Sequence, residues 1–294
     1  MNAPKERRRA AAPALPRAGT RAAALLALLL LTIAAPASRG ADERVLRVQD
    51  GDAERTYAVA ELTEAVGLTE LTVPDDPLFG ANRSYLGFAL PALLRHLGLG
   101  DAPELLLVCA DGYSIPFDAA DTLTQPVRGL LALRDTAEPA GSDRHWPPYH
   151  HGAELIDLDP FYLVWAPVDP GSDIDLGSLP WPYQLTEIRR LDRAAYFAPA
   201  RPPAAAGASV RQGFGVYQAH CGKCHRMRGT GGSVGPALDR DASLSALLTP
   251  EQLADFVRHD PRRFPQSKMP AFGASLSPAE IDAVVDYLKA MQER

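Results

Sequence analysis

Short apolar runs separated by turn residues characterise residues 41–197. Residues 45–49 and 55–59 flank a turn that contains Asp50-Gly51, which predicts a β-hairpin. Residues 89–97 have helical apolar spacing and end at Gly98, which predicts a helix. Further strands are predicted for four apolar runs, at residues 104–110, 130–133, 161–165 and 183–188. The pattern predicts an α+β domain of mixed α/β character over residues 41–197, with a long loop at residues 135–151.

Beyond residue 197 the pattern changes. Residues 198–209 are rich in alanine and proline and have no aromatic residue and no apolar periodicity, which predicts a semi-rigid linker. Residues 210–294 carry helical patterns, beginning with a helix at residues 210–220. The sequence therefore predicts a domain boundary at the linker and an all-α domain after it.

Two helices of this second domain have predicted N-caps. Thr249 is the candidate cap of a helix at residues 251–258. Ser277 is the second, because Pro278 follows at the first helical position and Glu280 completes a capping box. One apolar face of the last helix consists of Ile281, Val284, Val285 and Leu288.

The first 37 residues have the composition of an export signal. Six basic residues precede or adjoin the apolar stretch at residues 22–35, and Ala35-Pro36-Ala37 places small residues at the cleavage positions. This stretch of 14 residues is shorter than the roughly 20 that span a bilayer, so cleavage is favoured over an uncleaved N-terminal anchor. We expect residues 1–37 to be a signal peptide and the mature protein to be periplasmic, without a membrane span if the signal is cleaved.

Charge divides the remaining chain into two unlike parts. Residues 38–207 hold 13 basic and 26 acidic residues, a net charge of −13, and residues 208–294 hold 11 basic and 9 acidic residues, a net charge of +2. The chain as a whole is 46% hydrophobic and 22% charged, too charged for a protein with many membrane spans. The basic footprint of a nucleic-acid-binding protein is absent from the sequence.

The motif Cys221-Gly-Lys-Cys224-His225 carries the clearest chemistry. At a helix end, two thiols three positions apart lie on the same side, where they match the two vinyl groups along one haem edge. The next residue, His225, then projects its imidazole toward the iron. A redox dithiol would need a βαβ setting and a zinc site would need a second Cys/His pair, and neither is present in the sequence. We therefore predict one covalent haem c on Cys221 and Cys224, with His225 as an iron ligand.

The sixth position of the iron needs a thioether or an imidazole, and four residues of the domain offer one: Met227, His259, Met269 and Met291. Met227 is too close in sequence to His225 to cross the haem plane, and Met291 lies on the last helix. His259 stands at a helix end, where an exposed or capping histidine is expected. Met269 lies in a loop defined by proline and is the favoured ligand. Met/His ligation closes the iron, which favours an electron carrier over a catalyst.

Several features of the domain occur together in one known family. These are Gly213 and Tyr217 on the first helix, the C-G-K-C-H motif, Gly235-Pro236, Lys268-Met269-Pro270 and the last helix. With these features residues 208–294 resemble a class I cytochrome c. The resemblance implies Met269 as the axial ligand, electron transfer as the activity and a redox protein as the partner. It also implies that Gly213 lets the first and last helices cross closely near Tyr287.

Four segments of the N-terminal domain carry a second resemblance: Y-L-G-F-A-L-P-A-L-L at residues 85–94, A-D-G-Y-S at 110–114, P-F-Y-L-V-W at 160–165 and W-P-Y-Q at 181–184. Residues 45–192 resemble, in a divergent form, the molybdopterin-binding domain of the sulfite oxidase family. Active members bind molybdenum through a cysteine upstream of the segment matched by residues 87–90, where this chain has none. Cys109 lies downstream, in a predicted buried strand, and a core role is favoured over a molybdenum thiolate.

We therefore expect a scaffold or docking domain without molybdopterin at residues 41–197. The alternative is a molybdenum oxidoreductase of the sulfite dehydrogenase type, which would pass electrons to the haem. Other groups of metal-ligand residue types are His145, His150 and His151, then Asp157 and Asp159, then Asp173 and Asp175. None has the spacing of a zinc or calcium site, so an exposed loop and turn chemistry are expected.

Six basic residues lie close in sequence to the predicted haem ligands: Lys223, Arg226, Arg228, Arg262, Arg263 and Lys268. As a group they predict a positive haem edge that steers an acidic surface toward it. That surface belongs either to an external partner or to the acidic domain of the same chain. Docking of the second kind would loosen as salt rises.

Overall fold

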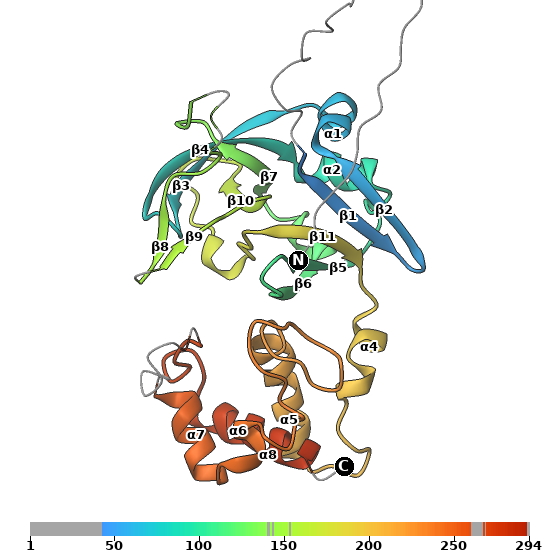
Figure 1. Ribbon diagram of the computed structural model, residues 1–294, viewed down its shortest axis with the longest axis vertical. Coiled ribbons are helices and arrows are strands. Elements are labelled where there is room, and N and C mark those ends of the chain that lie inside the picture. Colours follow the sequence, from blue (N-terminus) through green and yellow to red (C-terminus); the bar gives the residue numbers. More distant parts are fainter. Residues whose placement is uncertain are drawn as a thin grey trace, which may run out of the picture. The chain divides into compact units, whose positions relative to one another are not determined.

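A computed structural model describes residues 43–139, 142, 144–152, 154–259, 267 and 269–292. The predicted signal peptide lies outside these residues, as do Arg262, Arg263 and Lys268. The chain forms one compact unit from Gly40 to Arg294. Within it we distinguish a β region, residues 43–192, and a helical region, residues 193–292 (Figure 1). Among the described residues, no helix has the length and apolar character that a membrane crossing requires.

One half of the β region is a five-stranded sheet with the strand order β2-β1-β11-β5-β6. Its strands are β1 Val45–Asp50, β2 Ala53–Ala58, β5 Glu104–Cys109, β6 Ser114–Asp118 and β11 Leu185–Arg190. The antiparallel pairing of β1 with β2 confirms the hairpin predicted at Asp50-Gly51, where Gly51 has a φ of 59°. β6 is an edge strand, which explains why Pro116, with no backbone N–H, is tolerated in it.

The other half is a four-stranded antiparallel sheet with the order β10-β7-β4-β3. Its strands are β3 Thr69–Asp76, β4 Ala81–Ala89, β7 Val127–Asp135 and β10 Tyr162–Pro167, and a separate hairpin joins β8 Tyr149–His151 to β9 Glu154–Ile156. The strands predicted at residues 130–133 and 161–165 fall on β7 and β10. The β3–β4 pair was not predicted, although Leu71 and Val73 alternate with polar residues along β3.

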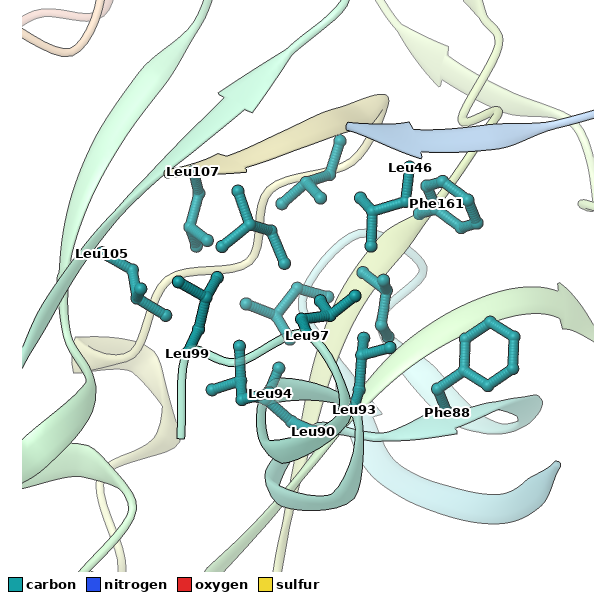
Figure 2. Packing of buried hydrophobic residues seen from close by; sticks show 14 of the residues in the cluster. Leu46, Phe88, Leu90, Leu93, Leu94, Leu97, Leu99, Leu105, Leu107 and Phe161 are labelled. Carbon is teal, nitrogen blue, oxygen red and sulfur yellow. The ribbon is translucent and has the colours of Figure 1, made fainter. Parts of the chain in front are cut away.

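Short helices complete the β region: α1 Val59–Val66, α2 Leu90–His96, α3 Ala119–Thr122 and the 3₁₀ turn Leu176–Ser178. The helix predicted at residues 89–97 is α2, and Gly98 follows it with a φ of 77°. Leucines from α2 point into a core that strands β1 and β5 complete with Leu46, Leu105 and Leu107 (Figure 2). Burial of each leucine contributes about 1.5–3 kcal/mol relative to leaving it exposed, so this core is a main source of stability in the β region.

The helical region contains α4 Arg193–Tyr196, the 3₁₀ turn Ala198–Ala200, α5 Ala208–Val216, the π turn Tyr217–Cys221, α6 Leu244–Leu247, α7 Pro250–Arg258 and α8 Pro278–Gln292. Both predicted caps are present. The Gln252 amide donates to Thr249 Oγ1 at 3.3 Å, and the Glu280 amide donates to Ser277 Oγ at 3.3 Å. A mixed β-rich region followed by a helical region agrees with the predicted order of the two fold classes.

Helices α5 and α8 cross closely, as predicted at Gly213. A Cβ at this position would lie 1.9 Å from the Ala283 carbonyl oxygen and 2.8 Å from Tyr287 Cβ, so only glycine fits. The core of the helical region, which is separate from the two apolar clusters of the β region, surrounds this crossing. It reaches back into the segment predicted as a linker, because Ala200 is fully buried in it and accepts a 2.7 Å hydrogen bond from the Tyr287 hydroxyl. The first residues of that segment are therefore part of the packed helical region.

Candidate haem-binding site

A π turn places the first cysteine of the motif. Helix α5 continues into Tyr217–Cys221, where the Gly222 amide donates to the Tyr217 carbonyl over 2.7 Å. The chain then folds back, because the amides of Cys224 and His225 both donate to the Cys221 carbonyl, at 3.1 and 2.9 Å. π turns are rare in proteins, and those that occur are often found at functional sites. The sequence predicted a simple helix here, so the local widening at the attachment motif is a new finding.

The loop after the motif is fixed by its own backbone. The Gly232 amide donates to the Gly222 carbonyl at 2.8 Å, and the Gly235 amide donates to the Cys224 carbonyl at 2.9 Å. The buried Tyr217 hydroxyl lies 3.1 Å from the His225 carbonyl oxygen and 2.9 Å from that of Thr230. These bonds hold the attachment loop, which we define as residues 221–236, in one conformation without regular secondary structure.

Neither cysteine of the motif takes part in a disulfide. Burial raises the pKa of Cys221 to about 12, with the neighbouring Cys224 adding to the effect, and burial also raises the pKa of Cys224. Redox dithiols need a lowered pKa, because the thiolate is the reactive form. A zinc site needs four ligands, and no group of three or more His, Cys, Asp and Glu side chains is placed to hold a metal ion in the described part of the chain. The pair is suited to thioether formation instead.

A hydrogen bond on the Nδ1 side of the ring orients the imidazole of His225. Its Nδ1 lies 2.8 Å from the Pro236 carbonyl oxygen, and because a carbonyl oxygen only accepts, Nδ1 carries the proton. In the neutral ring Nε2 then keeps its lone pair for a metal. Burial lowers the pKa of His225, which favours this neutral form, and the bond to Pro236 opposes the shift.

Gly235 packs directly against the same ring. A Cβ at Gly235 would lie 2.2 Å from His225 Cε1. The backbone of Gly235 can therefore contact the imidazole ring only because this residue has no side chain. The two cysteines and a neutral histidine whose Nε2 is available are the groups by which a protein would attach haem c and hold its iron. The residues of this site therefore fit a covalent haem.

Met269 lies on the edge of the helical core with its side chain half-buried. Its amide donates to Ser267 Oγ at 3.3 Å. The following chain is tied to α7, since the Phe272 amide donates to the Val257 carbonyl at 3.0 Å and the Gly273 amide to the Arg258 carbonyl at 3.1 Å. Residues 260–266 and 268 lie outside the described residues.

The other candidate ligands are engaged elsewhere. The side chains of Met227 and Met291 are 0% and 2% exposed within the helical core. His259 ends α7, and its Nδ1 forms a 2.7 Å contact with the Asp255 carboxylate on an exposed surface. These placements agree with the sequence reasoning that set the three residues aside.

Cys109 does not fit a molybdenum ligand. Its side chain is 4% exposed in the main core of the β region, and burial raises the pKa of the thiol far above its usual value. A metal ligand would have to be a thiolate, which this environment disfavours. The core role expected for Cys109 matches its place in the structure.

The other predicted candidates have ordinary structural contacts. His145 Nδ1 lies 3.0 Å from the carboxylate of Asp159, which also accepts a 2.8 Å bond from Trp146 Nε1. The backbone amide of Asp159 donates to Asp157 Oδ1 at 3.0 Å, and that of Gly177 donates to Asp175 Oδ1 at 3.0 Å. Both are turn contacts, as expected for these aspartates.

The sequence missed one neighbour of the attachment loop. The turn between β5 and β6 contacts it through two backbone bonds: the Ser114 amide donates to the Lys223 carbonyl at 2.9 Å, and the Ser233 amide donates to the Gly112 carbonyl at 2.8 Å. Lys223 is half-buried there, and burial lowers its pKa. Main-chain donors and acceptors of this kind leave no signal in a residue pattern.

Comparison with known proteins agrees with this geometry. Residues 208–288, about a quarter of the chain, match the family model for cytochrome c oxidase, cbb3-type, subunit III. The chain matches no curated protein. The matched segment begins with α5, contains the attachment loop and ends on α8. The helical region thus contains a cytochrome c domain.

Proposed function

We propose that this protein is an exported c-type cytochrome that carries single electrons in the periplasm. One haem is bound through thioethers to Cys221 and Cys224, and its iron is held by His225 and Met269. The observation that carries the proposal is the bond from His225 Nδ1 to the Pro236 carbonyl, which leaves Nε2 for the iron within a cytochrome c domain.

The bound haem supplies a one-electron iron couple. The protein fixes the imidazole through the bond to Pro236 and provides Met269 from the half-buried edge of the helical core. Two protein ligands leave the iron no open position for substrate, so electron exchange with a redox partner protein is favoured over catalysis. A thioether ligand also raises the reduction potential relative to two histidines.

The β region serves as a scaffold or docking domain in this proposal. Its resemblance to the molybdopterin-binding domain of the sulfite oxidase family suggests an origin, and the burial of Cys109 argues against molybdenum binding. Metal analysis of purified protein separates the two functions. We expect one iron per chain without molybdenum; equal amounts of iron and molybdenum would instead establish the sulfite dehydrogenase type of enzyme.

The axial ligand is tested by near-infrared spectroscopy of the oxidised protein. A methionine sulfur on the iron gives a weak charge-transfer band, which we expect in the wild type and not in Met269→Ala. His259→Ala is the matched control, because its ring is already paired with Asp255, and it should keep the band. Absence of the band from the wild type would contradict methionine ligation, and retention of the band in Met269→Ala would contradict Met269 as the ligand.

Export is tested by fractionation and mass spectrometry. The protein is expected in the periplasmic fraction, with an N-terminus at Ser38 after cleavage behind Ala37. Recovery of the full-length chain in the membrane fraction would instead indicate an uncleaved anchor.

A further inference from the structure

The β5–β6 turn and the attachment loop meet at the motif itself. Lys223, whose carbonyl accepts from the Ser114 amide, lies between the two cysteines in sequence. On the other side of the contact, the Gly112 carbonyl accepts from the Ser233 amide. Two bonds in opposite directions fix both the distance and the orientation of the two segments.

Tyr113 stands between these two bonds. Its side chain is half-buried and packs against the main core of the β region. Cys224 follows Lys223 in the chain and is itself half-buried. The backbone beside the second cysteine of the motif is therefore held against the β5–β6 turn.

Gly112 shows how close the approach is. It has a φ of 90°, and a Cβ there would lie 2.2 Å from Ser233 Oγ and 3.3 Å from the Ser233 carbonyl carbon. From the other segment, a Cβ on Gly232 would lie 2.0 Å from the Lys223 carbonyl oxygen and 2.9 Å from the Gly112 carbonyl oxygen. Glycines on both segments thus permit main chain to pack on main chain.

We propose that the β5–β6 turn is a permanent clamp on the haem-attachment loop, which holds the backbone of Lys223, next to Cys224, and that of Ser233. The proposal deepens the proposed function, since it rests on a haem bound at Cys224. It makes the β region the resident partner of the haem domain. An external redox partner must then approach the haem from another side.

The clamp also differs from the electrostatic docking that the charge pattern predicts. Its contacts are backbone amide-to-carbonyl bonds, which depend little on ionic strength, whereas attraction between an acidic and a basic surface is screened within about 10 Å at 0.1 M salt. The two regions should therefore stay together at low and at high salt. X-ray scattering profiles of the holoprotein that keep one compact shape across this range are expected; a profile that expands with salt would contradict the clamp.

Amide hydrogen exchange of the holoprotein tests the clamp directly. We expect the amides of Ser114 and Ser233 to exchange at least tenfold more slowly than the amide of Gly171, which lies in an exposed turn. Fast exchange at both positions would overturn the proposal. The haem content of the same sample distinguishes failure of the proposed function from failure of the clamp. Protected amides without covalent haem would refute the proposed function alone, and bound haem with unprotected amides would refute the clamp alone.

Two pairs of variants test whether protection of the Ser114 and Ser233 amides depends on the contact between the β5–β6 turn and the attachment loop. Ser114→Pro removes the amide donor, and β6 already accommodates Pro116 at an equivalent outward position of the edge strand. Ser114→Ala keeps the amide and removes only a buried hydroxyl that has no hydrogen-bond partner among the described residues. We expect the Ser233 amide to lose its protection in Ser114→Pro and to keep it in Ser114→Ala. Equal protection in both variants would contradict the clamp.

The second pair controls for backbone strain. Gly112 and Gly171 both have a φ of 90°, but a Cβ at Gly171 meets no atom within 4 Å. A leucine at either position carries the same conformational cost, and only Gly112→Leu pushes against Ser233. We expect Gly112→Leu to expose the Ser114 and Ser233 amides and Gly171→Leu to leave both protected. Loss of protection in both variants would assign the effect to strain rather than to the clamp.

Discussion

The β region and the helical region are stabilised by different kinds of interaction. In the β region two sheets and short helices bury two large apolar clusters, and even the carboxyl group of Asp76 is fully buried, where it accepts a 2.9 Å bond from the Tyr85 hydroxyl. The helical region has a smaller core around the α5–α8 crossing. Between α5 and α6, the attachment loop is held by backbone hydrogen bonds and by the Tyr217 hydroxyl, and of its residues Met227 is fully buried in this core.

This difference indicates which region needs the haem. The attachment loop contains no helix or strand beyond the π turn that ends at Cys221. A covalently attached haem would therefore contribute a larger share of the stability of the helical region than of the β region. The β region has no such need, because its core is complete. We therefore expect loss of the haem to affect the two regions unequally.

The largest effect is expected for the double variant Cys221→Ala/Cys224→Ala. It should lose all covalent haem, and the helical region should unfold at much lower temperature while the β region keeps its structure. Hydrogen exchange resolved by region measures both. Cys109→Ala is the matched control, because this third cysteine lies in the β core and should leave haem content unchanged. Equal loss of protection in both regions would contradict the expectation that the haem stabilises mainly the helical region.

A second prediction concerns the crossing of α5 and α8. Gly213→Ala places a methyl group against the Ala283 carbonyl and should destabilise the helical region by about 1–3 kcal/mol. Gly215→Ala on the same helix meets no atom within 4 Å and should stabilise it by about 0.5–1 kcal/mol through helix propensity. Thermal unfolding followed by haem absorbance measures both. Similar effects at the two glycines would rule out a tight crossing.

The close crossing at Gly213 could be predicted from the sequence because the family resemblance implied it. The caps at Thr249 and Ser277 could be predicted because capping depends on local residue patterns. The hairpin at Asp50-Gly51 was accessible for the same reason. Long-range features were not. The β3–β4 pairing depends on tertiary packing, and the bond from Ser114 to Lys223 joins main-chain groups whose side chains carry no signal.

Within the site, the sequence pointed to Cys221, Cys224 and His225 through their spacing, and the geometry then showed how His225 is oriented. The π turn that ends at Cys221 was not predicted, because the apolar pattern of residues 210–220 indicated only a continuous helix. Ala200 was assigned to a linker since alanine and proline dominate the segment, yet its small side chain is what allows burial beside Tyr287. Composition alone does not separate a flexible segment from a closely packed one.

A smaller effect is expected at Asp76, in the β region. Burial raises the pKa of this carboxyl, and hydrogen bonds from Tyr85, Leu78, Phe79 and Tyr162 oppose the shift. A raised pKa in the folded state means that the protonated form is favoured by folding. The contribution of Asp76 is therefore most favourable below the usual aspartate pKa of about 4 and is lost as pH rises through the raised value.

Asp76→Asn cannot ionise and isolates this contribution. The free energy of unfolding of the wild type relative to Asp76→Asn should fall as pH rises from about 4 toward neutrality and then level off. Denaturant titrations of the β region at several pH values measure the difference. A relative stability that rises with pH would contradict the direction of the shift.

The smallest effect is expected at the cap of α7. Thr249→Ala removes the Oγ1 that accepts the Gln252 amide bond and should cost about 1 kcal/mol in the helical region. Thr249→Ser keeps the hydroxyl and should cost much less. Neither variant should alter the β region, and an equal cost for serine and alanine would assign the effect to the lost methyl group.

The covalent haem itself is tested most directly by the intact mass of the denatured, purified protein. The account predicts one species whose mass equals the mature chain plus one haem. Its cysteines should be reactive toward an alkylating reagent only at Cys109, because thioethers occupy the other two. A mass equal to the chain alone, with all three cysteines alkylated, would contradict the assignment of this protein as a c-type cytochrome.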